Sequence, residues 1–152
     1  MPSLVVPSPL GALTLTSDGS SITNIDFGKH AKTMASSDKV LMKCRKELQE
    51  YFDGKRSSFS ATVSPEDTAF QKKVWREMLC IPYGSTISYK ELSKRAGKPN
   101  AIRAAASACG KNPIVILVPC HRITASNGGI GGYSGGVEKK RWLLRHERET
   151  QA

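Results

Sequence analysis

Three short runs near the N-terminus are rich in valine, leucine, threonine and isoleucine. They are LVV at 4–6, ALTLT at 12–16 and ITNIDF at 22–27. The sequences PLG and SDGSS, which separate the runs, are typical of turns. This pattern predicts short strands connected by turns. We therefore expect a small three-stranded sheet at this end of the chain.

The following stretch has apolar residues at helical spacing, namely Val40, Leu41, Cys44, Leu48, Tyr51 and Phe52. A helix is predicted here, with Ser37 available to cap its start and Gly54 to end it. No residue pattern in this half points to chemistry. We interpret residues 1–64 as a β-rich scaffold domain, joined to the rest through the polar stretch SATVSPEDT at 60–68.

From residue 65 the pattern is helical. Two capping boxes, T-x-x-Q at 68–71 and S-x-x-E at 88–91, each open a predicted helix. The second of these ends at Gly97, and NAIRAAASACG at 100–110 predicts another. The apolar face of the first helix is expected to hold Phe70, Val74, Met78 and Leu79.

Two short helices around a glycine-containing turn indicate a helix-turn-helix, although a plain helical hairpin has the same pattern. The predicted fold class is α+β. It comprises a small N-terminal domain of a three-stranded sheet plus a helix, and a mainly helical C-terminal domain, residues 65–152, with the helix-turn-helix.

A candidate reactive group follows the second domain's only strongly apolar run. IVILV at 114–118 predicts a buried strand that leads into PCHRI at 119–123. A glycine-rich loop at 127–136 and a last helix, VEKKRWLLRHE, complete the domain. Cys120 therefore lies at a strand end, beside His121 and under a loop, where neighbouring cationic or basic groups would lower the pKa of a thiol.

Charge makes nucleic acid the expected partner. The 152 residues carry 23 Lys and Arg against 13 Asp and Glu, a net charge of +10. Residues 1–64 contribute +2 and residues 65–152 contribute +8. Such a surplus in one part of a chain is typical of polyanion binding, although a merely basic protein would also have it. No apolar run approaches a membrane span and the N-terminus has no basic signal region, so we predict a cytoplasmic protein with no membrane contact.

The cysteines and histidines predict no metal. Cys44, Cys80, Cys109 and Cys120 include no CxxC pair, so we expect free thiols, three of them buried among apolar residues. The three histidines, His30, His121 and His146, have no ligand spacing with one another or with the cysteines.

The helix at 100–110 is unusual for one that reads bases, because its body is mostly alanine with one long polar side chain, Arg103. Small residues allow a helix to approach DNA closely, and one arginine can enter a groove or a gap in the base stack. This favours sequence-independent binding. The alternative is that the alanines pack in the core and Arg103 is simply solvated.

The segment from about residue 65 to 148 resembles the O6-alkylguanine-DNA alkyltransferase family. The resemblance rests on Tyr89 in ISYKEL, Arg103 in the alanine-rich helix, Asn112-Pro113, PCHRI at 119–123, GGYSGG at 131–136 and WLLRHE at 142–147. Residues 1–64 resemble the family only in forming a small β-rich domain. Some family members hold zinc in the N-terminal domain; because residues 1–64 offer only His30 and Cys44, we predict no zinc and no cofactor.

The resemblance implies a single-turnover enzyme, a methylated-DNA–protein-cysteine methyltransferase, that flips O6-alkylguanine from double-stranded DNA and moves the alkyl group irreversibly onto Cys120. His121 would act as general base and Glu147 would orient it. It implies further roles for residues around them: Asn112 would brace the turn, Tyr89 would donate to the guanine ring, and the pocket would include Ile123, Tyr133 and Ser134.

For DNA, the resemblance implies minor-groove binding by a monomer, with Arg103 taking the place of the flipped base. Lys90 and Ser126 are further candidate contacts. The main alternative is an alkyltransferase-like protein that holds the lesion without transfer, but that group replaces the cysteine, typically with tryptophan. A plain helix-turn-helix regulator and a Cys-His hydrolase each account for part of the pattern, but neither explains PCHRI, the charge and Arg103 together.

Overall fold

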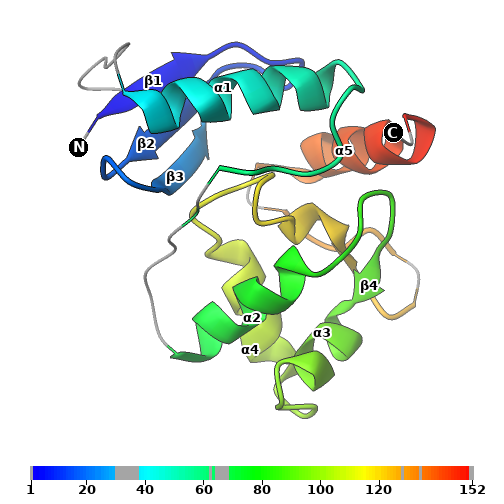
Figure 1. Cartoon of the computed structure of the whole chain (residues 1–152). Coiled ribbons are helices and arrows are strands. Elements are labelled where there is room, and N and C mark those ends of the chain that lie inside the picture. The colour runs from blue at the N-terminus through cyan, green and yellow to red at the C-terminus, as the bar shows by residue number, and fades with distance from the viewer. Residues whose placement is uncertain are drawn as a thin grey trace. The chain divides into compact units, whose positions relative to one another are not determined.

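The computed structural model describes residues 2–29, 38–61, 63, 69–127, 129–133 and 135–150. The chain divides into two compact units (Figure 1). The N-terminal unit comprises Met1–Pro65, Pro113–Leu117 and Thr150–Ala152, and the C-terminal unit comprises Glu66–Asn112 and Val118–Glu149. The short segment 113–117 thus groups with the N-terminal unit although it lies late in the sequence.

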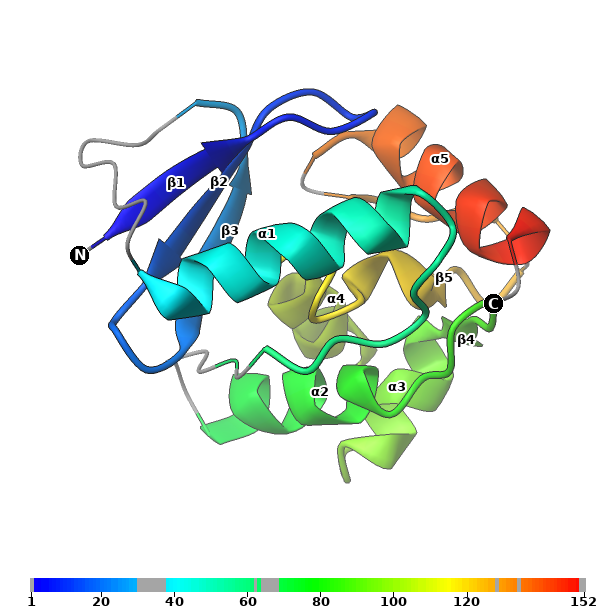
Figure 2. The same cartoon turned by 45° about the horizontal axis from the view of Figure 1, so that its top comes forward.

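The N-terminal unit contains the predicted sheet. Strands β1 (Ser3–Val6), β2 (Leu13–Ser17) and β3 (Ile22–Phe27) pair antiparallel in the order β1-β2-β3. Helix α1 (Lys39–Phe52) packs against all three strands, as Figures 1 and 2 show. The buried apolar residues of this layer pair are Leu4, Val6, Leu13, Leu15, Ile22 and Ile25 on the sheet and Leu41, Cys44, Leu48 and Tyr51 on the helix.

The start of α1 differs from the prediction. Asp38 is the N-cap, and its Oδ1 accepts a hydrogen bond from the Leu41 amide at 2.9 Å, which satisfies one of the free amides of the first turn. Its Oδ2 also accepts from the Ser17 hydroxyl at 3.2 Å. The cap was predicted one residue too early, at Ser37, which lies outside the described residues.

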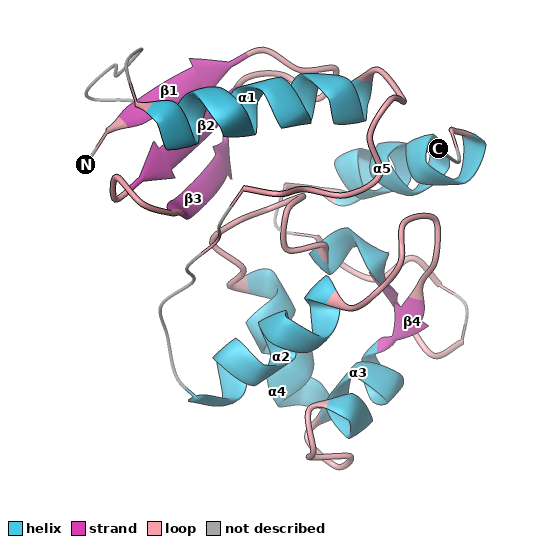
Figure 3. Cartoon of the chain, viewed as in Figure 1, coloured by secondary structure: helices cyan, strands magenta, loops and turns pink. Residues whose placement is uncertain are grey.

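The C-terminal unit is mainly helical (Figure 3). Its elements are α2 (Ala69–Leu79), β4 (Ile87–Ser88), α3 (Tyr89–Arg95), α4 (Ile102–Gly110), a 3₁₀ turn η1 (Cys120–Arg122), β5 (Ile123–Thr124) and α5 (Val137–Glu149). Helix α2 packs on α3 and α4, and the Trp75 indole donates to the Ala108 carbonyl at 2.9 Å. Strands β4 and β5 form a short parallel pair.

The predicted helix pair is α3 and α4, with Gly97 between them at φ +84°. Ser88 caps α3 as predicted, because its hydroxyl accepts from the Glu91 amide at 3.0 Å. The first capping box includes Thr68, which lies outside the described residues. Leu79 was wrongly placed on the buried face: at the end of α2 it is 45% exposed, whereas Val74 and Met78 are buried.

The predicted strand at 114–118 is absent, although its residues are described and buried. Only Ile114 makes a bridge, to Ile25 of β3, through Ile25 N–H to the Pro113 carbonyl at 2.9 Å. The chain then turns: Ile116 has φ +74°, and the Leu117 amide bonds back to the Val115 carbonyl at 2.9 Å. A left-handed residue ends strand pairing, and a continuous apolar run gives no sign of it.

None of the described helices is long and apolar enough to cross a membrane.

Candidate active site

Cys120 opens the 3₁₀ turn η1 and is almost completely buried, with 4% of its surface exposed. Its amide donates to the Val118 carbonyl at 2.8 Å, and the Asn112 side chain donates to the same carbonyl at 2.7 Å. Asn112, predicted to brace this turn, therefore fixes the backbone two residues before the thiol. The reactive atom is held by local backbone geometry.

The thiol faces a cavity of about 490 Å³ in the C-terminal unit. Small residues of α4 form one wall, and aromatic side chains and the glycine-rich loop form the others. The lining residues are Tyr89, Ala106, Cys109, Gly110, Cys120, Gly132 and Tyr133. This volume lies in the range of small-molecule sites and suits a flat aromatic ring.

The glycine-rich loop can approach the Tyr89 side chain closely because residue 131 is a glycine. Gly131 has φ +76°, and a Cβ there would lie 2.9 Å from the Tyr89 hydroxyl and 3.0 Å from its ring. A side chain at this position would push Tyr89 away or unfold the loop. The close approach thus depends on glycine at 131.

Behind Cys120 lies a buried chain of three charged or titratable groups. His121 Nε2 lies 2.6 Å from Glu147 Oε2, and both side chains are almost fully buried. Arg122 donates from Nε to Glu147 Oε1 at 2.8 Å and from Nη2 to Oε2 at 3.0 Å. Its third bond, from Nη1 to the Ile81 carbonyl at 2.7 Å, fixes the guanidinium. Arg122 thus neutralises the carboxylate that holds His121.

The electrostatics make His121 a neutral base. Burial lowers the pKa of His121 and outweighs the opposite effect of Glu147. Burial alone would raise the pKa of Glu147, but the bonds and charges of His121 and Arg122 hold it well below its ordinary value. An ionised carboxylate accepts the Nε2 proton and so fixes that tautomer. His121 Nδ1 is then left as the acceptor, and it has no hydrogen-bond partner among the described residues.

The thiol itself differs from the expectation. Burial raises the pKa of Cys120, although a hydrogen bond from Asn112 and the charge of Lys140 act in the opposite direction. The predicted lowering by neighbouring basic groups is therefore wrong for the free site: desolvation of the thiolate is the larger effect. The thiol remains protonated near neutral pH and needs a base to remove its proton.

Lys140 is a buried cation next to these groups. Its Nζ donates to the Ile123 carbonyl at 2.5 Å and to the Gly132 carbonyl at 3.0 Å, and it lies 5.7 Å from the centre of the Tyr89 ring. Burial lowers the pKa of Lys140, whereas Cys120 and Cys109 raise it. It ties the glycine-rich loop to the thiol turn and supplies positive charge near the sulfur.

Tyr89 has a raised pKa, chiefly because of burial and then because of Cys109. Tyr133 has a pKa well above its ordinary value, again chiefly because of burial. Both phenols therefore keep their protons at neutral pH and remain hydrogen-bond donors. The cavity is thus lined by two cysteines, Cys109 and Cys120, and by two protonated phenols.

The helix pair presents a basic surface of small residues. Arg103 and Ile102 are exposed at the start of α4, and Ala104 and Ser107 share the exposed side. The surrounding exposed cations are Lys90, Lys94, Arg95, Lys98 and Lys111. No acidic side chain interrupts α4. Sequence-independent contact of this helix with DNA stays a prediction.

Two family models match the chain along nearly its whole length. The model "6-O-methylguanine DNA methyltransferase, DNA binding domain" matches residues 69–149, and "6-O-methylguanine DNA methyltransferase, ribonuclease-like domain" matches residues 4–65. The chain belongs to this methyltransferase family. The predicted resemblance is thereby confirmed, and it extends to the N-terminal domain, where residue patterns indicated only a similarity of style.

Curated relatives and solved structures agree. The chain is 38% identical to a methylated-DNA–protein-cysteine methyltransferase of Methanosarcina barkeri, over 96% of each chain. It is 42% identical to one of Haemophilus influenzae, over 93% of this chain and 83% of the relative. The structure of Mycobacterium tuberculosis OGT in complex with DNA superposes with a TM-score of 0.92 at 36% identity, covering 99% of this chain and 94% of that one.

Within this family member, the predicted residues fall into two groups. Around the thiol lie Asn112, His121, Glu147, Tyr89 and Tyr133. Ile123 is buried and offers its carbonyl to Lys140 but is not among the described residues that line the cavity. Arg103, Lys90 and Ser126 are exposed, and Ser134 lies outside the described residues.

Three residues of the site were not predicted: Arg122, Lys140 and Cys109. Arg122 stands inside PCHRI, where it could be taken as a surface cation. The burial of Lys140 could have been predicted from the sequence. It precedes Leu143 and Glu147, which lie on the buried face of α5, by three and seven residues. Cys109 shares the buried face of α4 with Ala105 and Ala108.

The cysteines of the described chain are free thiols. Cys44 and Cys109 are buried free thiols as expected, but Cys80 is exposed at the end of α2. Among the described residues, no group of three or more His, Cys, Asp or Glu gathers in metal-binding geometry. His30 lies outside them, so the absence of zinc stays a prediction.

Proposed function

We propose that this protein repairs DNA by direct reversal, moving the alkyl group of O6-alkylguanine in double-stranded DNA onto Cys120. The observation that carries the proposal is a buried Cys120 thiol followed directly by a neutral His121 that is bonded to Glu147, in a member of this methyltransferase family. The relatives' printed names assign them methylated DNA as substrate and a protein cysteine as acceptor.

The reaction requires removal of the thiol proton, because burial keeps Cys120 protonated. His121 Nδ1 accepts that proton, directly or through water, and Glu147 stabilises the imidazolium that results. The thiolate attacks the saturated carbon of the alkyl group, a C–S bond forms and the bond from carbon to O6 breaks. The electron pair of that bond passes to the guanine.

Tyr89 balances the charge on the leaving guanine. It donates a hydrogen bond or its proton to the ring as negative charge develops there. Its raised pKa keeps the donor proton in place before the reaction. Lys140, whose charge lies beside the Tyr89 ring and acts on Cys120, stabilises thiolate and phenolate alike.

The proposal for DNA follows from the helix pair. A monomer places α4 in the minor groove, where its small residues allow close contact, and Arg103 fills the gap left by the flipped guanine. Lys90 and Ser126 contact the backbone. These DNA-binding roles are proposals. So are the domain boundary near residue 65, the place of Ser134 in the pocket and the cytoplasmic location.

Intact mass after incubation with duplex DNA that contains O6-methylguanine tests the reaction. We expect one methyl group per chain, located on the peptide with Cys120, because a thioether is stable: a thiolate is a poor leaving group when water attacks the methyl carbon. Cys120→Ser should gain none. Cys80→Ser, which removes an exposed thiol at the end of α2, should react as the unmodified chain does. Repeated turnover, or a methyl group on another residue, would refute the proposal.

A further inference from the structure

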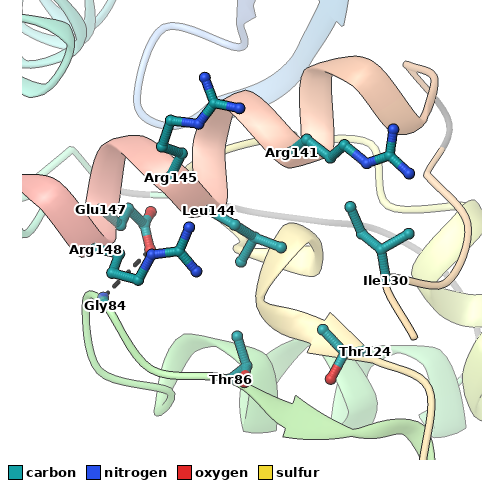
Figure 4. A pocket seen from close by; sticks show the side chains of 9 residues that line it. All are labelled: Gly84, Thr86, Thr124, Ile130, Arg141, Leu144, Arg145, Glu147 and Arg148. Atoms are coloured by element: carbon teal, nitrogen blue, oxygen red, sulfur yellow. Dashed lines mark hydrogen bonds between the residues drawn. The ribbon is translucent and has the colours of Figure 1, made fainter. Parts of the chain in front are cut away.

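A second cavity of about 610 Å³ lies in the C-terminal unit, and none of the described residues lines both it and the thiol cavity. It is bounded by α5, the loop before β4, and the segment that includes β5 (Figure 4). The lining residues are Gly84, Thr86, Thr124, Ile130, Arg141, Leu144, Arg145, Glu147 and Arg148. Glu147, which holds His121, is the one lining residue that the alkyl transfer uses, and none of the described lining residues belongs to α3 or α4.

One wall is a stripe of arginines on α5. Arg141, Arg145 and Arg148 follow one another at spacings of four and three residues and span ~10 Å along the helix axis. Like charges at these spacings destabilise a helix. Of the three, only Arg141 has an acidic partner in the described part of the chain, Glu138 at 3.1 Å.

The helix dipole accounts for part of this stripe. Arg148 lies in the last turn, where a cation is favoured by the carbonyl end of the helix. Arg141 and Arg145 lie further from that end and gain little from it. Arg145 has neither an acidic partner in the described part of the chain nor a favourable place in the dipole, so this wall keeps positive charge that an anion from outside can neutralise.

The remainder of the wall suits an anion. Glu147 is the one carboxylate among the described lining residues, and Arg122 already neutralises it from the other side. Thr86 and Thr124 lie across the cavity from Arg148 and Leu144 in Figure 4, and their hydroxyls can donate to an anion's oxygens. The described part of the lining holds no aromatic residue, so a nucleobase would find no surface there to stack on.

We propose that this cavity binds the phosphate groups of a nucleic-acid backbone, as a second contact apart from the helix pair. Arginine forks match phosphate oxygens in geometry. A span of ~10 Å is long enough to contact more than one phosphate of a B-DNA strand, whose charges are ~3.4 Å apart along the duplex axis. The lining offers guanidiniums and hydroxyls without a pattern of base-reading amides, so the contact is independent of sequence.

The first test compares salt dependence. The triple variant Arg141→Ala, Arg145→Ala and Arg148→Ala should bind an unmodified duplex more weakly, with the slope of log K against log salt reduced by about 2 to 3, since each phosphate contact contributes ~0.9. The matched control is Lys39→Ala, Lys43→Ala and Lys46→Ala on α1, which removes the same charge at the same spacing from exposed positions outside the cavity.

The control should change the slope by less than about half of one phosphate contact. Equal changes in both triple variants would mean that only net charge matters and would overturn the proposal. Replacing the three arginines by lysine should keep most of the slope but lower the affinity several-fold, because the fork geometry is lost. Unchanged affinity in the lysine variant would contradict phosphate recognition by arginine.

A second measurement locates the contact. Amide resonances of Thr86 and Thr124 should shift when unmodified oligothymidylate is added to the full chain, and the alanine triple variant should lose these shifts. Inorganic phosphate should produce the same shifts at ten-fold or higher concentration. Shifts with inorganic phosphate but none with the oligonucleotide would mean an adventitious ion only and would overturn the proposal. Tighter binding of a polyglutamate peptide than of the oligonucleotide would replace nucleic acid by an acidic protein and refute it as well.

Discussion

Replacing Glu147 by glutamine should both destabilise the protein and disable the base. Glu147 accepts from Arg122 at 2.8 and 3.0 Å and lies 2.6 Å from His121 Nε2, with 1% of its surface exposed. Glutamine keeps the shape but offers one acceptor and one donor. If its oxygen serves Arg122 Nε, its amide hydrogens face His121 and another N–H of Arg122.

The magnitude follows from these contacts. Removing one partner of a buried ion pair typically costs ~3–5 kcal/mol, because the other charge remains buried. Glutamine retains one hydrogen bond to the arginine, which is worth ~1 kcal/mol. We therefore expect a loss of about 2–4 kcal/mol in the free energy of unfolding at pH 7, a large part of the ~5–15 kcal/mol typical of a domain.

The pH dependence gives the reasoning a second test. The pKa of Glu147 is lowered in the folded protein, so its contribution to stability is present above its ordinary pKa of 4.5 and is lost as pH falls below that value. Glutamine cannot titrate. The difference in unfolding free energy between the two proteins should thus be greatest near pH 7 and shrink below pH 4.5.

In the variant, the glutamine amide donates to His121 Nε2 and so favours the tautomer with its proton on Nδ1. That nitrogen can then no longer accept the proton of the Cys120 thiol. The rate of alkyl transfer should fall ~10²–10⁴-fold, the range of general-base assistance. Urea unfolding and single-turnover kinetics measure the two effects. The control is Glu91→Gln, which removes a partly exposed pair with Arg95 and should cost ~0.3–0.5 kcal/mol. A stability loss for Glu147→Gln no larger than that of the control, or an unchanged rate, would refute the relay.

Three further variants test the rest of the site. His121→Ala should slow transfer ~10²–10⁴-fold with little change in DNA affinity, as binding assays beside single-turnover rates would reveal; equal losses in both would make it a binding residue. Arg103→Ala should lower transfer from duplex DNA but not from free O6-benzylguanine, and Arg103→Lys should rescue poorly because an ammonium cannot stack; equal losses with both substrates would contradict base flipping. Lys140→Met leaves the buried Ile123 carbonyl and the part-buried Gly132 carbonyl without their donor and should cost about 2 kcal/mol in urea unfolding. Its transfer rate should also require a higher pH, because the charge that lowers the pKa of Cys120 is gone; an unshifted pH profile would assign Lys140 a packing role alone.

The elements that local pattern determines were predicted well, and those set by tertiary context were not. The three strands, α1 and the cap at Ser88 follow from spacing and turn residues within a few positions of each other. The segment 114–118 was mistaken for a strand because continuous apolar runs look alike whether they pair or turn, and only the φ of Ile116 distinguishes them.

The candidate site shows the same division. Cys120 and His121 could be found from a short motif, and Glu147 from the family resemblance of WLLRHE. The sequence could not show that the pKa of Cys120 is raised, because the shift depends on how completely the thiol is buried. Lys140 and Arg122 were missed since a sequence does not reveal which cations are desolvated and which carboxylate or carbonyl satisfies them.

The segment 113–117 limits how this protein can be divided. The chain leaves the C-terminal unit at Asn112 and re-enters it at Val118, and the five residues between them belong to the N-terminal unit, where Ile25 of β3 exchanges backbone bonds with Pro113 and Val115. A fragment that begins after residue 65 would carry the apolar residues Ile114, Val115, Ile116 and Leu117 without the rest of the unit to which they belong. Such an exposed apolar run promotes aggregation. One cut in the chain therefore cannot separate the two units, and a soluble C-terminal fragment should require the N-terminal residues to be expressed with it as a separate chain.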